Sequence, residues 1–269
     1  MRIVKTLLQR CGDVVEFMAS GGAACRLSAI AAALDLPKST THRLLRELLD
    51  LGWMEQDGAD GPYRLSLRFA LLGHRVLQTT GLPDLVQPVL DALAAETREL
   101  VRLTMIRDGA AGSGLVWFAS AQGAPPGLLY QPAMGGDVVL HATANGKAFL
   151  ATATDAQAMV LARRAGFGKS RPTARTLTTP GALRAELAQA RARGYATAIE
   201  EAETGITAVA VGIGHAGGAG LGTVSVAGPS MRILPDRIPQ LAEQLRRAAA
   251  ALAAIGPHPA SRQGAMHEG

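Results

Sequence analysis

Hydrophobic residues recur with the 3.6-residue period of a helix in three successive stretches near the N-terminus. These stretches are residues 2–19, residues 28–34 and about residues 38–51. Ser28 is expected to cap the second helix, Pro37 suits the start of the third, and Gly52 is suited to follow its end. Two short strand-like runs within residues 53–65 flank a turn rich in Asp and Gly, which predicts a hairpin.

The third predicted helix has an apolar face and a polar, cationic face. The apolar face is formed by Thr41, Leu44, Leu45, Leu48 and Leu51. Helix starts normally favour negative charge, yet this one begins with hydroxyl groups and cations, so the missing negative charge is expected to come from a partner. Helix, short helix, turn, longer helix and hairpin is the order of a winged helix-turn-helix, whose recognition helix enters the major groove of DNA.

The sequence therefore predicts a DNA-binding surface at the start of this helix. Its expected members are Arg26, Ser28, Lys38, Ser39, Thr40, His42, Arg43 and Arg46. The alternative is a plain three-helix bundle with a solvated cationic face. The short turn, the polar first turn and the hairpin together favour the DNA-binding interpretation.

Residues 66–80 form a helical segment that is apolar on more than one side. Its hydrophobic members are Leu67, Phe69, Leu71, Leu72, Val76 and Leu77. Burial between two subunits or between domains would explain this pattern, and a second copy would supply the second half-site that a helix-turn-helix dimer needs.

Short strands and helices alternate in the larger part that follows Gly81-Leu82-Pro83. Strands are expected at residues 101–106, 115–119, 138–140, 195–199, 206–212 and 221–227, and helices at residues 84–97, 145–152, 156–164, 180–193 and 236–255. This mixture predicts an α+β sensor-like domain. The expected division is 1–65 winged helix-turn-helix, 66–80 linker helix, 81–255 effector domain and 256–269 disordered tail.

Composition narrows the class only slightly. Lys and Arg number 27 against 22 Asp and Glu, and the resulting net charge of +5 suits a polyanionic partner without requiring one. Cys11 and Cys25 imply neither a disulfide framework nor a zinc site. No apolar run reaches the roughly 18 residues that span a bilayer, so no membrane is expected, and a cytoplasmic location is.

Several short motifs that could carry enzymatic chemistry fail on inspection. Gly146-Lys147 lacks the flanking residues of a phosphate loop, and Gly212, Gly214 and Gly217 are followed by a strand, so a glycine-rich hairpin is favoured there. Glu200 and Glu201 are adjacent on an extended segment, where a solvated strand end is the preferred interpretation. His141 and His215 are expected to be structural. No nucleophile elbow occurs, so no enzyme activity, cofactor or metal is predicted.

The chain resembles the IclR family of bacterial transcriptional regulators over nearly its whole length. The resemblance is carried by LPKSTTHRLLRELLDLGW, YRLSLRFALLG, LHATANGKAFLA, the run from ARTLTTPGALRAELAQARARGYA to IEEAETGITAVAV, and VSVAGP, in that order. It implies a C-terminal GAF-like effector-binding domain, homodimers that often pair into tetramers, and affinity for double-stranded operator DNA that a small metabolite modulates.

The resemblance also places an effector site. The matching residues are Val138, Ala144, Asn145, Gly146, Ala198, Ile206, Ala208, Ser225 and Ala227. Backbone N–H groups around residues 144–146, at a helix start, could hold a carboxylate. Ala198, Ala208 and Ala227 stand where members that bind small polar acids tend to carry acidic, thiol or hydroxyl groups, which favours a bulkier aromatic or branched carboxylate. The alternative is a cavity that is simply well packed.

The leading hypothesis is thus a ligand-responsive regulator of catabolic genes that senses a small organic acid. The rival hypothesis is a metabolite-binding module or metabolic enzyme whose N-terminal helices serve only assembly. The polar start of the third helix distinguishes the two hypotheses, because only a DNA-binding protein needs it.

Overall fold

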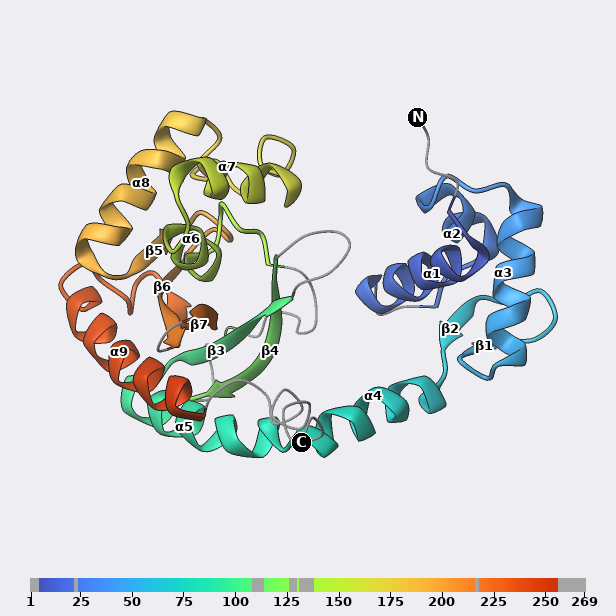
Figure 1. Cartoon of the computed structure of the whole chain (residues 1–269), viewed down its shortest axis with the longest axis horizontal. Helices are drawn as coiled ribbons and strands as arrows, with labels where there is room; N and C mark the ends of the chain where they lie inside the picture. The colour runs from blue at the N-terminus through green and yellow to red at the C-terminus, as the bar shows by residue number, and fades with distance from the viewer. Residues whose placement is uncertain are drawn as a thin grey trace, which may run out of the picture. The chain divides into compact units, whose positions relative to one another are not determined.

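The computed structural model describes residues 5–21, 24–107, 114–125, 130, 138–215 and 218–255. The chain divides into two compact units, Met1–Gly81 and Leu82–Gly269 (Figure 1). Each unit has a hydrophobic core of its own.

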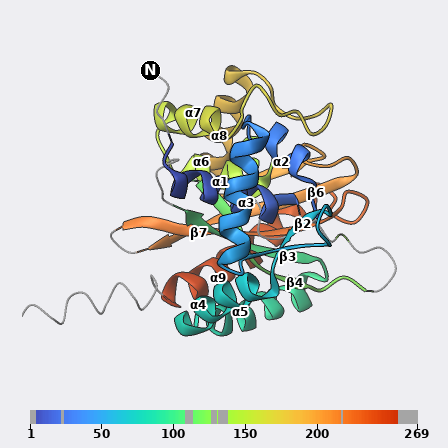
Figure 2. The ribbon, with the colours of Figure 1, turned by 90° about the vertical axis from the view of Figure 1, so that its right-hand side faces the viewer.

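The N-terminal unit has the predicted order of elements. Its elements are α1 (Leu7–Gly21), α2 (Leu27–Ala33), α3 (Lys38–Asp50), β1 (Met54–Gln56), β2 (Tyr63–Leu65) and α4 (Leu67–Thr80). The antiparallel hairpin pairs Met54 with Leu65, and β1 contacts α3, so the hairpin lies beside that helix (Figures 1 and 2). This arrangement confirms the winged helix-turn-helix.

The core of this unit lies between the three helices and the hairpin. It is formed by Val14, Met18, Ile30, Leu44, Leu45, Leu48, Met54 and Tyr63. Thr41 is buried beside them, as its position on the apolar face predicted. Gly52 follows α3 with a φ of 68°, a left-handed conformation that glycine adopts without a steric penalty.

Two local expectations for this unit were wrong. Ser28 does not cap α2, because the helix begins one residue earlier at Leu27 and Arg26 takes the cap position without a side-chain hydrogen bond. Leu51 does not face the core: α3 ends at Asp50, and Leu51 is 50% exposed.

α4 begins where predicted, and its apolar residues are not covered within the structure. The Ser66 hydroxyl caps it by accepting from the Phe69 N–H at 3.2 Å, and Gly81 ends it with a φ of 62°. None of the residues of α4 is buried. The helix thus presents a series of exposed leucines and valines, as its multi-sided apolar pattern suggested.

The second unit is an antiparallel sheet covered by helices on both faces. Its elements are α5 (Leu82–Thr97), β3 (Leu100–Arg107), β4 (Gly114–Gln122), α6 (Ala144–Ala151), α7 (Asp155–Arg164), α8 (Pro180–Arg193), β5 (Ala196–Ile199), β6 (Ile206–His215), β7 (Gly218–Pro229) and α9 (Ile238–Ile255). The strand order is β4-β3-β7-β6-β5. This is the predicted α+β class.

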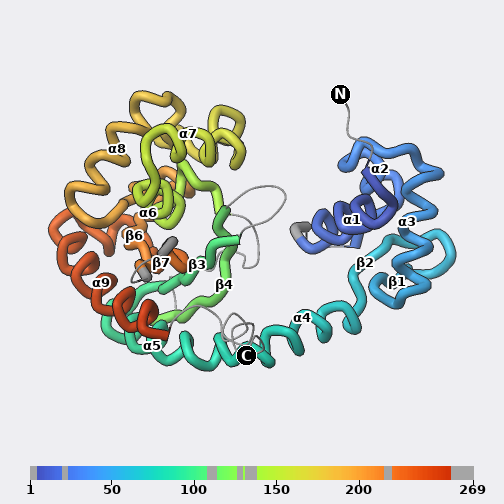
Figure 3. Tube along the Cα trace, viewed as in Figure 1, coloured from blue at the N-terminus to red at the C-terminus, as the bar shows by residue number. Residues whose placement is uncertain are grey.

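Strand alternation separates two layers of side chains. Val101, Leu103, Val209 and Val226 face α5 and α9, and form the larger core with them. The opposite face carries Ala196, Ala198 and Ala210, which pack with α6 and α8. The trace in Figure 3 shows α5 and α9 on one side of the sheet and α6 and α8 on the other.

Three boundaries in this unit differ from the sequence-based expectation. Residues 138–140 are not a strand: Val138 bonds to the Leu115 carbonyl, but the Ala142 and Thr143 N–H groups bond to the Val139 carbonyl, which turns the chain into α6. α5 starts at Leu82, because Pro83 in its first turn lacks only an N–H that would have no helical partner. α9 starts at Ile238, after a turn at residues 235–237.

Other boundaries were predicted correctly. Thr179 caps α8 by accepting from the Ala182 N–H, Pro180 is its first residue, and Gly194 ends it. β6 and β7 form the expected glycine-rich hairpin. The expected disordered tail, residues 256–269, lies outside the described residues. No helix within the described part of the chain is both long and apolar enough to cross a bilayer.

Candidate functional site

The start of α3 is open to solvent in the structure. Lys38, Ser39, His42, Arg43 and Arg46 are exposed, and Thr40 is half-buried. Pro37 occupies the cap position without a side-chain hydrogen bond, and the first turn contains no acidic residue. The unpaired N–H groups at a helix start therefore lie beside cations and hydroxyls, an arrangement suited to an anionic partner.

The hairpin extends this surface. A hollow of about 310 Å³ is lined by Arg26 and Ser28 from α2 and its cap, by Lys38 and His42 from α3, and by the hairpin residues around Gln56 and Asp60. The structure thus brings together four of the eight predicted DNA-contacting residues. Ser39, Thr40, Arg43 and Arg46 lie along the same helix outside the hollow.

The effector residues expected from sequence gather mainly on the α6 face of the sheet. In the strand register Ala198 pairs with Ala208 and Ala208 pairs with Ala227, so the three alanines form one row across β5, β6 and β7. Ser225 lies in the neighbouring row, opposite Ala210. Ala144 and Ala198 pack in the same apolar cluster, so part of this region is tightly filled.

Val138 and Ile206 lie at the margins of this region. Val138 is buried in the adjacent cluster with Phe149 and Leu150 rather than with the alanine row. Ile206 is half-buried where β6 begins, and it pairs with Pro229.

The start of α6 offers fewer free N–H groups than its sequence suggested. Thr143 caps the helix, and its hydroxyl accepts from the Gly146 N–H at 3.0 Å. A Cβ at Gly146 would lie 2.3 Å from the Leu140 Cα, so glycine is required there by close backbone packing. Asn145 is buried and donates to the Thr223 hydroxyl at 2.9 Å, and that hydroxyl lies 2.6 Å from the Thr104 hydroxyl.

A buried arginine that sequence reasoning missed stands on the same face. Arg102 of β3 is 5% exposed, and its register partner on β7 is Ser225. Its guanidinium carbon lies 3.2 Å from the centroid of the Trp117 ring. Burial lowers the pKa of Arg102 to about 10, although interaction with Tyr130 opposes this shift.

Tyr130 connects this arginine to the loop that precedes β6. Burial, followed by the charge of and hydrogen bond to Glu203, raises the pKa of Tyr130 to about 12. Arg102, Tyr130 and Glu203 therefore form a polar cluster at the edge of the alanine row. A sequence signal existed: Arg102 is a charged residue inside a strand whose neighbours on both sides are hydrophobic.

The adjacent carboxylates Glu200 and Glu201 do not form the solvated strand end expected from sequence. Glu200 has a φ of 57°, which turns the chain after β5. Lys147 Nζ, on a side chain with no solvent exposure, lies 2.7 and 2.8 Å from the two Glu201 carboxylate oxygens. Burial raises the pKa of Glu201, and Lys147 opposes this shift.

His141 is buried between the same layers and has a structural partner. Its Nε2 lies 2.9 Å from the Ser170 carbonyl oxygen, and its ring meets Phe167 edge to face. His215 has no described side chain. Among the described residues, no three metal-ligating side chains are placed to share an ion.

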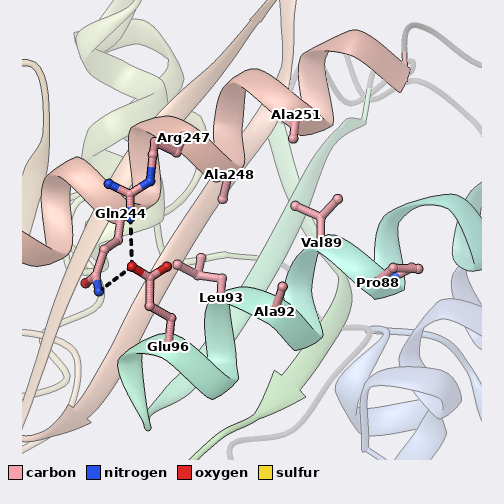
Figure 4. Close-up of a pocket in the computed structure, with 9 residues that line it drawn as sticks. All are labelled: Pro88, Val89, Ala92, Leu93, Glu96, Gln244, Arg247, Ala248 and Ala251. Atoms are coloured by element: carbon pink, nitrogen blue, oxygen red, sulfur yellow. Dashed lines mark hydrogen bonds and ion pairs between the residues drawn. The ribbon is translucent and has the colours of Figure 1, made fainter.

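A further hollow, of about 370 Å³, lies on the opposite side of the sheet from Arg102. It is formed by small and apolar side chains of α5 and α9, including Val89, Ala92 and Ala248 (Figure 4). Glu96 closes one end by accepting from Gln244 and Arg247. Because α5 and α9 cover the other face, this hollow is separate from the predicted effector residues.

A winged helix-turn-helix joined to an α+β ligand-sensing unit defines a class, the ligand-responsive transcriptional regulators. Residues 7–58 match the IclR helix-turn-helix domain, and residues 74–254 match the C-terminal domain described as bacterial transcriptional regulator IclR C-terminal. The chain therefore belongs to the IclR family of bacterial transcriptional regulators.

Comparison with known proteins agrees over most of the chain. The chain is 30% identical to the transcriptional repressor IclR of Escherichia coli strain K12 over 242 residues, which is 90% of this chain and 86% of that protein. The structure of a putative IclR regulator from a Silicibacter species superposes with a TM-score of 0.79 at 24% identity, covering 93% of this chain and 96% of the other.

A second solved structure contains a ligand. It is an IclR homolog from Microbacterium hydrocarbonoxydans complexed with 4-hydroxybenzoate, with a TM-score of 0.70, 25% identity, and coverage of 93% of this chain and 98% of the other. Members of the family with these two domains bind operator DNA and small-molecule effectors, and the curated relatives are transcriptional regulators rather than enzymes.

Proposed function

We propose that this protein controls catabolic genes by binding operator DNA through the first turns of α3, and that a small organic acid with an aromatic body sets its DNA affinity. It acts in the cytoplasm, where the DNA lies, as a homodimer or a dimer of dimers. The observation that carries this proposal is the exposed start of α3, where cations and hydroxyls surround uncapped N–H groups.

The aromatic acid is supported by two independent observations. The three alanines in one row of the sheet leave little side-chain volume over β5, β6 and β7. A relative of the same fold carries 4-hydroxybenzoate, a planar aromatic acid. Effector binding then changes operator affinity by the difference in effector affinity between the two arrangements of the protein, typically about 1 to 3 kcal/mol.

A homodimer is supported by α4. Its exposed apolar residues include Leu67, Leu71 and Val76, and none of its residues is buried. Covering this helix with its counterpart from a second copy would remove these side chains from water. It would also pair two recognition helices, as palindromic half-sites require.

Arg43→Ala tests the DNA-binding proposal most directly. A duplex selected by the wild-type protein from a random library serves as the probe, and affinity is measured by fluorescence anisotropy across salt concentrations. We expect a loss of about 1 to 3 kcal/mol if Arg43 contacts a base, or a salt slope smaller by about one unit if it contacts a phosphate.

Arg184→Ala is the matched control, because it removes the same charge from an exposed position of α8 in the other unit. Its affinity and salt slope should equal those of the wild type. Equal behaviour of Arg43→Ala and Arg184→Ala at every salt concentration would reject α3 as the recognition helix.

A further inference from the structure

Arg102 places a buried cation among the residues expected to contact the effector. Along its row of the sheet it is followed by Ser225 and Ala210, and the next row on the same face holds Ala208 and Ala227. Side chains two residues apart on a strand share a face, so Arg102 points to the same side as the alanine row. Asn145 reaches this side from α6, through its hydrogen bond to Thr223.

The surroundings of Arg102 hold its guanidinium in a fixed plane. Trp117, 3.2 Å away at the ring centroid, covers one side of that plane. Stacking of this kind restrains the rotation of a planar guanidinium and leaves its N–H edge available for a planar anion. Arginine is the preferred side chain for a carboxylate because its two parallel N–H groups match the two carboxylate oxygens.

The energetics favour an anion at this position. Burial lowers the pKa of Arg102 to about 10, which means that the charged guanidinium is less well stabilised here than in water. A carboxylate brought against it would regain part of that lost stabilisation in a region of low dielectric. Tyr130, whose phenol interacts with both Arg102 and Glu203, separates the glutamate charge from the arginine.

We propose that Arg102, stacked on Trp117, is the residue that binds the carboxylate of the effector, and that it makes the sensor selective for acids over neutral analogues. This role replaces the start of α6 as the main carboxylate contact, because the Gly146 N–H there is already bonded to Thr143. The inference rests on the proposed function, since it assumes that the second unit senses a small molecule.

The test compares acids with neutral molecules of the same shape. Benzoate, 4-hydroxybenzoate, benzamide and 4-hydroxybenzamide are titrated into the full-length protein, and binding is followed by calorimetry and by the shift in thermal midpoint. We expect at least one acid to bind the wild type at least tenfold more tightly than its amide. Arg102→Gln should raise the dissociation constant of that acid by about ten- to a hundredfold and remove the preference.

Two further variants keep the result interpretable. Arg246→Gln is the control, because Arg246 also lies over an aromatic ring, that of Tyr195 at 5.9 Å, but belongs to α9. It should bind the acid as the wild type does. If circular dichroism shows that Arg102→Gln does not fold, Arg102→Lys decides, since it keeps the charge but loses the planar pair of donors.

Equal binding of acid and amide by the wild type, absence of binding by all four compounds, or unchanged acid affinity in a folded Arg102 variant would each overturn the inference. The proposed function fails separately, through operator binding that is insensitive to Arg43→Ala. An effector unit that binds no aromatic acid in a protein that still needs Arg43 for DNA would thus reject Arg102 alone.

Discussion

Lys147 Nζ lies 2.7 Å from Glu201 Oε1 and joins the start of α6 to the loop between β5 and β6. The lysine side chain has no solvent exposure, and that of Glu201 is 12% exposed. The hydroxyl of Thr176 donates to the Glu201 carbonyl at 2.7 Å and fixes the same loop from a third segment. This loop also holds Glu203, so the ion pair positions one wall of the candidate effector site.

Lys147→Met should destabilise the protein strongly. Removing one partner of a buried ion pair leaves the other charge without compensation, which typically costs about 3 to 5 kcal/mol. Urea unfolding followed by circular dichroism measures the loss. The double variant Lys147→Met/Glu201→Gln is the control, and it should recover part of the loss because it removes the uncompensated carboxylate as well. A single variant as stable as the double would contradict this account.

The loss should depend on pH in a defined direction. Burial raises the pKa of Glu201 above its ordinary value of 4.5, and Lys147 opposes that rise. Without Lys147 the pKa rises further, so the folded state holds a proton that the unfolded state releases, and stability falls as pH rises above about 4.5. Unfolding measured between pH 5 and 8 should show the Lys147→Met deficit growing with pH. A deficit that shrinks toward pH 8 would be the contrary result.

Sequence reasoning succeeded where local chemistry decides the structure. The helices of the N-terminal unit follow from the spacing of residues such as Ile30, Leu44 and Leu48, and the ends of α3 and α8 follow from Gly52 and Gly194. These features depend on neighbours a few residues away. The winged helix-turn-helix and the α+β class could therefore both be predicted.

Sequence reasoning failed where distant segments meet. Lys147 and Glu201 are 54 residues apart, and nothing in the local sequence shows that a turn at Glu200 brings them together. Arg102 likewise gains its meaning from Trp117 and Ser225, which lie on neighbouring strands. The row formed by the three alanines required the strand register, which only the fold supplies.

Gly146→Ala should destabilise the effector unit. The added Cβ would meet the Leu140 backbone at 2.3 to 2.6 Å, and backbone cannot move aside as a flexible side chain can. Overpacking of this kind costs about 1 to 3 kcal/mol or more. Gly181→Ala in α8 is the matched control, because a Cβ there meets nothing within 4 Å. Thermal unfolding of the two variants should separate them, and equal midpoints would show that Leu140 does not restrict this position.

Leu72→Glu should weaken self-association and operator binding together. Leu72 is 40% exposed on α4, and a charge placed in an apolar helix–helix contact must lose its hydration without gaining a partner. We expect the dimer dissociation constant to rise about tenfold or more, as measured by analytical ultracentrifugation. Operator affinity should fall in parallel because a monomer binds only one half-site.

Ala192→Glu provides the comparison for this variant, since it adds the same charge at an exposed position of α8. It should leave both measurements at their wild-type values. A Leu72→Glu protein that remains dimeric with full affinity for DNA would exclude α4 as the contact between copies. The exposed leucines of α4 would then need another partner, because a helix with apolar residues on several sides is not stable in water alone.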